Sequence, residues 1–114
     1  MKEYLMLIRE NQEAYEKMTS EEMQQCIELH VKWVEEMTSN GNFKDASPLM
    51  PDGKIIKGRE KLVTDGPYIE AKEAVSGYYI LLAASLEEAA GIASDCPDLD
   101  MGASVEIREI MPAE

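Results

Sequence analysis

The sequence contains little of what builds a metal centre or a disulfide framework. It has one histidine, His30, and two cysteines, Cys26 and Cys96, which lie far apart and outside any CxxC spacing. Both cysteines are therefore predicted to be small buried hydrophobic residues, and a metal ion would have to rest on carboxylates. The sequence also has no phosphate loop, nucleotide fingerprint or nucleophile elbow. We expect no metal ion and no cofactor.

Positive charge is scarce as well. Eleven Lys and Arg stand against 23 Asp and Glu, which gives a formal charge of −12. This charge repels phosphate backbones and anionic headgroups, so nucleic acid and membrane surfaces are not expected partners. No apolar run approaches the roughly 20 residues of a transmembrane helix, and the opening residues lack the features of a signal peptide. These absences predict a cytoplasmic protein.

The length of 114 residues predicts a single domain that spans residues 1–114. The hydrophobic fraction of 45% is ordinary for a globular protein, so a packed core is expected. Surface-to-volume scaling nevertheless leaves so short a chain only modestly stable on its own. A partner subunit would add stability.

Hydrophobic periodicity and turn residues predict the elements along the chain. The longest is a helix from Ser20 to about Ser39, which begins with the capping-box spacing of Thr19 and Glu22. The other expected elements are a buried central strand at 4–8, a loop or irregular edge strand at 42–53, a hairpin at 54–64, a strand at 77–83, a short helix after Ser85 and a strand at 103–108.

This order is βαββαβ with an irregular insertion. It predicts an α+β protein with a ferredoxin-like antiparallel sheet and two helices on one face. The strands at 4–8 and 77–83, however, carry apolar side chains on both faces. Two helices cover only one face, so the other is expected to be buried against a second subunit. The sequence therefore predicts a homodimer.

His30 is the first candidate for chemistry. It lies on the apolar stripe of the long helix, and its neutral and charged forms are both accessible near neutral pH. It could serve as a general acid or base in a cleft. The alternative is a packed histidine whose ring nitrogens bond to backbone, and the stripe alone favours that alternative.

Asp65 is the second candidate, because the rigid turn that follows in Asp65-Gly66-Pro67 could hold its carboxylate against His30 and fix the ring tautomer. The alternative is an Asx-turn in which the carboxylate accepts local backbone N–H groups. The two interpretations are compatible with each other.

The remaining candidates would line a pocket or bind a small organic molecule. Arg108 lies on the polar side of the last strand, where it could hold a substrate carboxylate or pair with a surface acid. Trp33, Tyr78 and Tyr79 could offer indole and hydroxyl donors, although aromatic residues at such positions are more often core or interface. Tyr68, in the turn after Asp65, is a further pocket candidate.

The segment VTDGPYIEAKEAVSGYYIL, from Val63 to Leu81, resembles the signature of YCII-related proteins of the DGPF type. That signature reads close to VTDGPF, an acid, KE and GGYY. The opening YLMLI, the TSEEM helix start with a histidine near its middle and the closing SVEIREI extend the resemblance over nearly the whole chain. Tyr68 stands where Phe is usual, and Ser76 stands where the first Gly of the pair is usual.

The resemblance implies a dimeric α+β barrel in which two ferredoxin-like sheets pack face to face. It also implies a site built from a histidine and an aspartate, and the matching positions here are His30 and Asp65. The family has no generally established reaction. Similar barrels elsewhere carry out cofactor-free isomerisation, monooxygenation or dehalogenation, and fold analogy does not choose among them.

Three functions remain open at this point. One is a small enzyme that uses a His–Asp pair for acid/base chemistry without a cofactor. Another is a non-catalytic metabolite-binding or regulatory module, because some relatives implied by the resemblance occur near sigma factors of the extracytoplasmic type. The third is a structural dimer in which His30 is merely packed.

Overall fold

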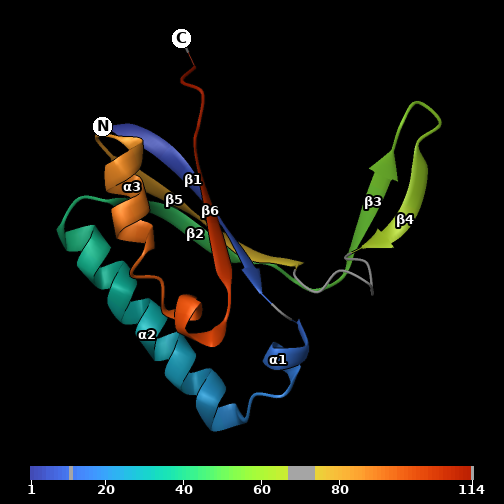
Figure 1. The fold of residues 1–114 in the computed structure, drawn as a ribbon, viewed down its shortest axis with the longest axis horizontal. Helices are drawn as coiled ribbons and strands as arrows, with labels where there is room; N and C mark the ends of the chain where they lie inside the picture. Colours follow the sequence, from blue (N-terminus) through green and yellow to red (C-terminus); the bar gives the residue numbers. More distant parts are fainter. Residues whose placement is uncertain (11, 67–73, 114) are drawn as a thin grey trace.

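A computed structural model describes residues 1–10, 12–66 and 74–113. The protein is α+β, with a layer of helices on one face of a four-stranded antiparallel sheet (Figure 1). The strands are β1 (Lys2–Glu10), β2 (Phe43–Pro48), β3 (Gly53–Lys57), β4 (Leu62–Gly66), β5 (Ala74–Ala83) and β6 (Ser104–Glu109). The helices are α1 (Gln12–Glu16), α2 (Ser20–Ser39) and α3 (Leu86–Ala93), with a 3₁₀ helix η1 (Pro97–Met101).

The large sheet has the strand order β2-β5-β1-β6. The two apolar strands β1 and β5 lie at its centre and pair with Leu7 opposite Tyr78, and the predicted central strand is therefore confirmed. β2 is an edge strand, and its register shifts between Phe43 and Asp45. Of residues 42–53, which were expected to form a loop or an irregular edge strand, Phe43–Pro48 form that strand and 49–52 lead on to β3.

Helix α2 has the bounds that its sequence predicts. The Thr19 hydroxyl accepts the backbone N–H of Glu22, and the Glu22 carboxylate accepts that of Thr19, at 3.1 Å each. These two bonds satisfy N–H groups that have no partner within the helix. In α3, Ser85 accepts the N–H of Glu88 at 3.1 Å in the same way.

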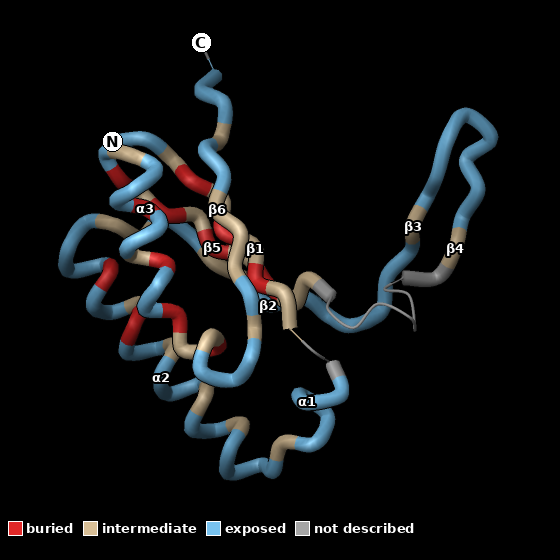
Figure 2. Tube along the Cα trace, viewed as in Figure 1, coloured by how far each residue is buried: buried red, intermediate tan, exposed pale blue. Residues whose placement is uncertain are grey.

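The core lies between the helices and one face of the sheet (Figure 2). Alternate residues of β1 and β5 point into it, as the period of two requires. Trp33 and Met37 of α2 cover them from one side, and Ala89 and Ala93 of α3 let that helix approach closely. The buried strand residues in this cluster are Tyr4, Met6, Ile8, Tyr79, Leu81 and Ala83.

The opposite face of the sheet has no helix over it in the described part of the chain (Figure 1). Its apolar side chains are only half-buried, and they are Leu5, Leu7, Tyr78, Ile80 and Leu82.

Strands β3 and β4 form a separate two-stranded hairpin that projects from the body (Figure 1). The turn runs through Gly58 and Lys61, which both have positive φ, as the predicted turn near Gly58 requires. Ile56 and Leu62 of the hairpin are more than 60% exposed, so among the described residues these two side chains have little apolar cover. The hairpin is thus an insertion between β2 and β5.

Two short elements were not expected from the sequence. Helix α1 forms in a segment without apolar periodicity, and η1 follows α3 directly after Cys96. Pro97 occupies the first turn of η1, where its missing N–H costs no hydrogen bond, and Gly102 ends the element with a φ of 86°. No helix in the described ranges is long and apolar enough to cross a bilayer.

Candidate functional site

A cavity of about 780 Å³ lies between the N-terminal half of α2, the sheet and the chain that leads from β2 to β3. Its walls are largely apolar, with Met23, Ile27 and Val31 of α2 on one side and Leu49 and Ile55 on the other. Four polar side chains converge on one part of its lining, and they are Glu10, His30, Tyr79 and Asp98. An apolar cavity with a few convergent polar groups is typical of a small-molecule site.

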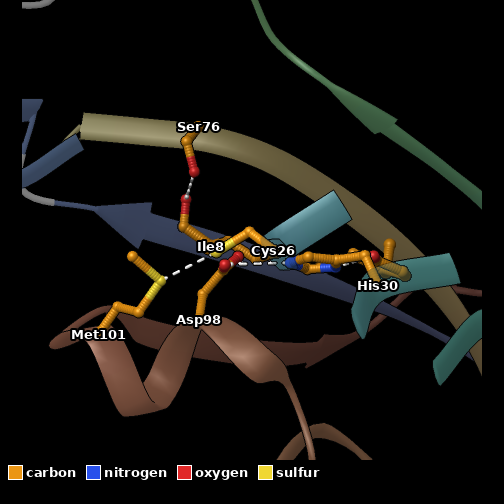
Figure 3. A network of polar contacts seen from close by, with 7 residues as sticks. Ile8, Cys26, His30, Ser76, Asp98 and Met101 are labelled. Carbon is orange, nitrogen blue, oxygen red and sulfur yellow. Dashed lines mark hydrogen bonds and ion pairs between the residues drawn. The ribbon is translucent and has the colours of Figure 1, made fainter. Parts of the chain in front are cut away.

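His30 contacts two of these groups through its two ring nitrogens. Nδ1 lies 2.6 Å from the Tyr79 hydroxyl, and Nε2 lies 3.0 Å from Oδ1 of Asp98. Figure 3 shows Asp98 of η1 and His30 of α2 pointing toward one another. The ring is also held by aromatic neighbours, because it stacks on Tyr79 and meets Trp33 edge-on.

The partners decide the tautomer of the ring. An ionised carboxylate can only accept, so Nε2 carries a proton and donates it to Asp98. In the neutral ring Nδ1 is then an acceptor, and the Tyr79 hydroxyl donates to it. Both nitrogens of His30 are therefore engaged within the protein.

Asp98 is buried, with 7% of its surface exposed, because η1 turns it in between α2 and the sheet. Burial alone would raise the pKa of this carboxyl, but its hydrogen bond to His30 and the charge of the ring outweigh burial and lower the pKa below the usual value. Asp98 is thus ionised when the pair is formed.

Glu10 ends β1 and joins the same network. Its carboxyl forms hydrogen bonds with the side chains of Asp98 and Ser76. Burial, and then the hydrogen bond and charge of Asp98, raise the pKa of Glu10 from 4.5 to about 7. Ionisation of both carboxyl groups in contact is costly, so below about pH 7 the pair holds one proton, which resides on Glu10.

Cys96 lies beside this network. Its sulfur, Nε2 or Nδ1 of His30 and an oxygen of Asp98 all lie within 4.8 Å of one another, a spacing that a metal ion could bridge. The His30 and Asp98 atoms are already paired, and the thiol accepts backbone N–H groups of Asp98 and Leu99. Burial raises the pKa of Cys96 to about 12, which favours the neutral thiol over the thiolate that metals bind. Hydrogen bonding accounts for the cluster, and we assign no metal to it.

The other residues expected at the site lie in different places. Tyr78 lines the cavity, whereas Trp33 is 5% exposed and packs in the core against Tyr79 with ring centroids 4.9 Å apart. Arg108 is exposed on β6 and is not part of the cavity lining. Asp65 pairs with Lys54 through the β4 backbone, and its side chain lies outside the described part of the structure. Tyr68 also lies outside the described residues.

Sequence reasoning did not single out Asp98 or Glu10. Asp98 follows Cys96-Pro97 in an acidic stretch, where an aspartate normally indicates a solvated turn. Glu10 begins a polar segment after the apolar strand. The only signal for Glu10 was its position, since the end of a buried strand can place a carboxyl at a cavity.

Comparison with known proteins gives one family. No curated protein matches the chain. The model of the YCII-related domain matches residues 2–114, essentially the whole chain. With its four-stranded α+β fold and a His–Asp pair at an apolar cavity, the chain belongs to the YCII-related domain family.

Proposed function

We propose that the cavity binds a small organic molecule and that the His30–Asp98 pair supports acid/base chemistry on it without a cofactor. The observation that carries the proposal is the contact of 3.0 Å between Nε2 of His30 and Asp98 at the lining of an apolar cavity. The two residues are 68 positions apart in the sequence, yet the fold sets them in one network. A His–Asp pair that joins other ionisable groups at a ligand-sized apolar space is a candidate setting for acid/base chemistry.

The aspartate in this proposal differs from the one expected from the sequence. Asp98 makes the contact with His30 that the sequence analysis expected of Asp65. A role for Asp65 stays a prediction, together with the roles expected for Trp33, Tyr68 and Arg108 in the pocket. Of the pocket candidates whose side chains are described, Tyr78 and Tyr79 belong to the cavity lining, and Tyr79 is the one whose hydroxyl reaches His30.

The test uses 5-nitrobenzisoxazole, a neutral aromatic probe that opens to a coloured phenolate when a base removes its ring proton. We expect chelator-treated protein to accelerate this reaction, and Asp98→Asn to lower the rate at least tenfold, since general bases contribute about 10²–10⁴-fold. Asp95→Asn is the matched control, because Asp95 is exposed three residues earlier. A wild-type rate no higher than that of Asp98→Asn would reject catalysis.

A second function is favoured by a separate observation. Both ring nitrogens of His30 are occupied by Tyr79 and Asp98, so the ring has no free position for a substrate. A rigid, non-catalytic binding module, including one that regulates a sigma factor, would use the cavity in this form. It predicts that bound probe raises the melting temperature while no product forms.

We also propose that two copies pair through the open sheet face as a ferredoxin-like dimeric barrel. The half-buried apolar residues of β1 and β5 form the centre of this face. Two ion pairs lie beside them, Arg9 with Glu106 at 2.7 Å and Lys44 with Glu3 at 2.9 Å. Arg108 opposite Leu5 and Asp45 opposite Ile80 add one charge of each sign. A second copy, itself at −12, meets less repulsion on this face than on the rest of the acidic surface.

Light scattering coupled to gel filtration tests the dimer. Ile80→Glu places an unpaired charge at the centre of the face and is expected to yield monomers. Ile56→Glu is the control, because Ile56 is 64% exposed on the projecting hairpin. A wild-type protein that elutes as a monomer at micromolar concentration contradicts the dimer and leaves the cavity proposal intact.

A further inference from the structure

The hydrogen bonds around His30 form one chain across the lining of the cavity. The Tyr79 hydroxyl donates to His30, His30 donates to Asp98, and the protonated Glu10 carboxyl also donates to Asp98. The two inner members cannot meet a bound molecule directly, because His30 has both nitrogens engaged and Asp98 is 7% exposed. Only the ends of this chain can exchange a proton with a bound molecule.

The two ends differ. Tyr79 is itself 7% exposed, and burial raises the pKa of its hydroxyl well above the usual value. Glu10 is only half-buried, and it lines the cavity at the end of β1. It also lies beside Ser76, whose hydroxyl reaches back to the carbonyl oxygen of Ile8 at 3.5 Å (Figure 3). The end that is both accessible and ionisable is Glu10.

We propose that Glu10 is the catalytic residue that exchanges a proton with the bound molecule, and that Asp98 and His30 are positioning residues behind it. This inference rests on the proposed acid/base function of the cavity. The described lining carries the acids Glu10, Glu16, Asp52 and Asp98 against the bases His30 and Lys54. A carboxylate would meet net negative charge here, and the largely apolar walls do not solvate a cation, so the molecule we expect is an uncharged, largely apolar carbon acid.

The proton balance of the step is simple. The Glu10 carboxylate takes a proton from a C–H bond of the molecule, and the electron pair of that bond moves into the molecule. In 5-nitrobenzisoxazole the pair forms a nitrile, the N–O bond breaks and the phenolate leaves. Glu10 then returns its proton to water, while Asp98 stays ionised against His30.

The environment of Glu10 fits this role. The titratable groups that face it are Asp98 of η1, His30 and Cys26 of α2, Cys96 and Tyr15. Burial, and then the charge of Glu10, raise the pKa of the Tyr15 hydroxyl. Burial and Asp98 bring the pKa of Glu10 to about 7, which makes it a stronger base than an ordinary carboxylate. The carboxylate form is present above that pH.

The experiment measures the 5-nitrobenzisoxazole rate from pH 5 to 9 for wild type and Glu10→Gln. We expect the wild-type rate to rise and level off above about pH 7, as Glu10 loses its proton. Glu10→Gln should lose at least tenfold at the plateau, together with the inflection, because an amide cannot accept the proton. Glu28→Gln is the matched control, since Glu28 is exposed on α2 and removes the same charge.

Two further measurements separate the possible outcomes. Asp98→Asn removes the negative charge next to Glu10, so the inflection in the rate profile should move to lower pH. If Glu10→Gln fails to fold, this shift is the result that tests the role of Glu10. A Glu10→Gln rate equal to wild type, with Asp98→Asn still slow, overturns the role of Glu10 and leaves the proposed function standing. A wild-type profile without an inflection overturns the role of Glu10, and a wild-type rate no higher than that of Asp98→Asn overturns both proposals.

Discussion

Both halves of helix α2 carry an apolar stripe, but the two halves contact different parts of the protein. In the C-terminal half, Trp33 and Met37 are buried against the sheet. In the N-terminal half, Met23, Cys26 and His30 are half-buried and border the cavity. Figure 2 shows this contrast as buried segments toward the end of the helix and exposed ones toward its start. An amphipathic pattern thus predicts which side of a helix faces inward, and what it meets there depends on the opposing elements.

The largest expected change in stability comes from a substitution in the buried C-terminal half of α2. Trp33→Ala removes a 5% exposed side chain that packs on Tyr79, and it should lower the free energy of unfolding by about 4 kcal/mol, as large-to-small core changes do. Urea unfolding followed by circular dichroism measures this loss. A loss below 1 kcal/mol would mean that the two halves of α2 are not distinct.

The second-largest effect tests whether the polar network around His30 stabilises the N-terminal half of α2, which borders the cavity. Asp98→Ala leaves His30 without its carboxylate partner, and it should cost about 3 kcal/mol at pH 7, the low end for a broken buried pair. Because the pKa of Asp98 is lowered in the folded state, this contribution is present above about pH 4 and is lost as pH falls further. Urea midpoints for both proteins between pH 3 and 7 check the trend.

Glu10→Gln should raise the free energy of unfolding, whereas the two substitutions above lower it. The folded-state pKa of Glu10 is raised from 4.5 to about 7, so ionisation destabilises the fold as pH rises through that window. After a discount for solvent screening of this half-exposed group, the free energy of unfolding of the variant should exceed that of wild type by about 1 kcal/mol at pH 8. The two proteins should be equally stable at pH 4. Thermal unfolding at the two pH values provides the measurement, and equal melting temperatures at pH 8 would contradict it.

The smallest effect on stability is expected at Ile27, which is 49% exposed and borders the cavity. Ile27→Ala should cost less than about 1 kcal/mol, because little apolar surface is buried there in the folded protein. It should instead raise KM for 5-nitrobenzisoxazole several-fold and leave the pH inflection in place. A loss as large as that of Trp33→Ala would erase the contrast between the two halves of the helix.

Most of the fold could be predicted from the sequence, because short-range sequence patterns specify most of its helices and strands. The capping box at Thr19, the N-cap at Ser85, the continuous apolar run of β1 and the alternation in β6 are local patterns, and each element lies where its pattern predicts it. Elements without such a pattern, α1 and η1, were missed.

Only part of the site could be predicted, again because the sequence shows local patterns and not contacts between distant segments. His30 could be singled out because one ionisable ring stood on an apolar stripe. Its partner depended on how η1 folds back onto α2, a contact between segments that no spacing in the sequence encodes. The same holds for Glu10, whose elevated pKa arises from burial and from Asp98.

The projecting hairpin belongs to a segment that leaves and rejoins the sheet at one point. The Leu49 N–H donates to the carbonyl of Ser76 at 2.8 Å, so β2 and β5 would remain neighbours if a short turn replaced the residues between them. Part of that segment, at Gly53 and Ile55, lines the cavity, while the His30 network comes from elsewhere in the chain. Ala74 and Val75 of β5 pair with Glu10 and Arg9, so evolution or design can exchange the hairpin of β3 and β4 alone, changing which molecules fit while the proton-handling residues stay in place.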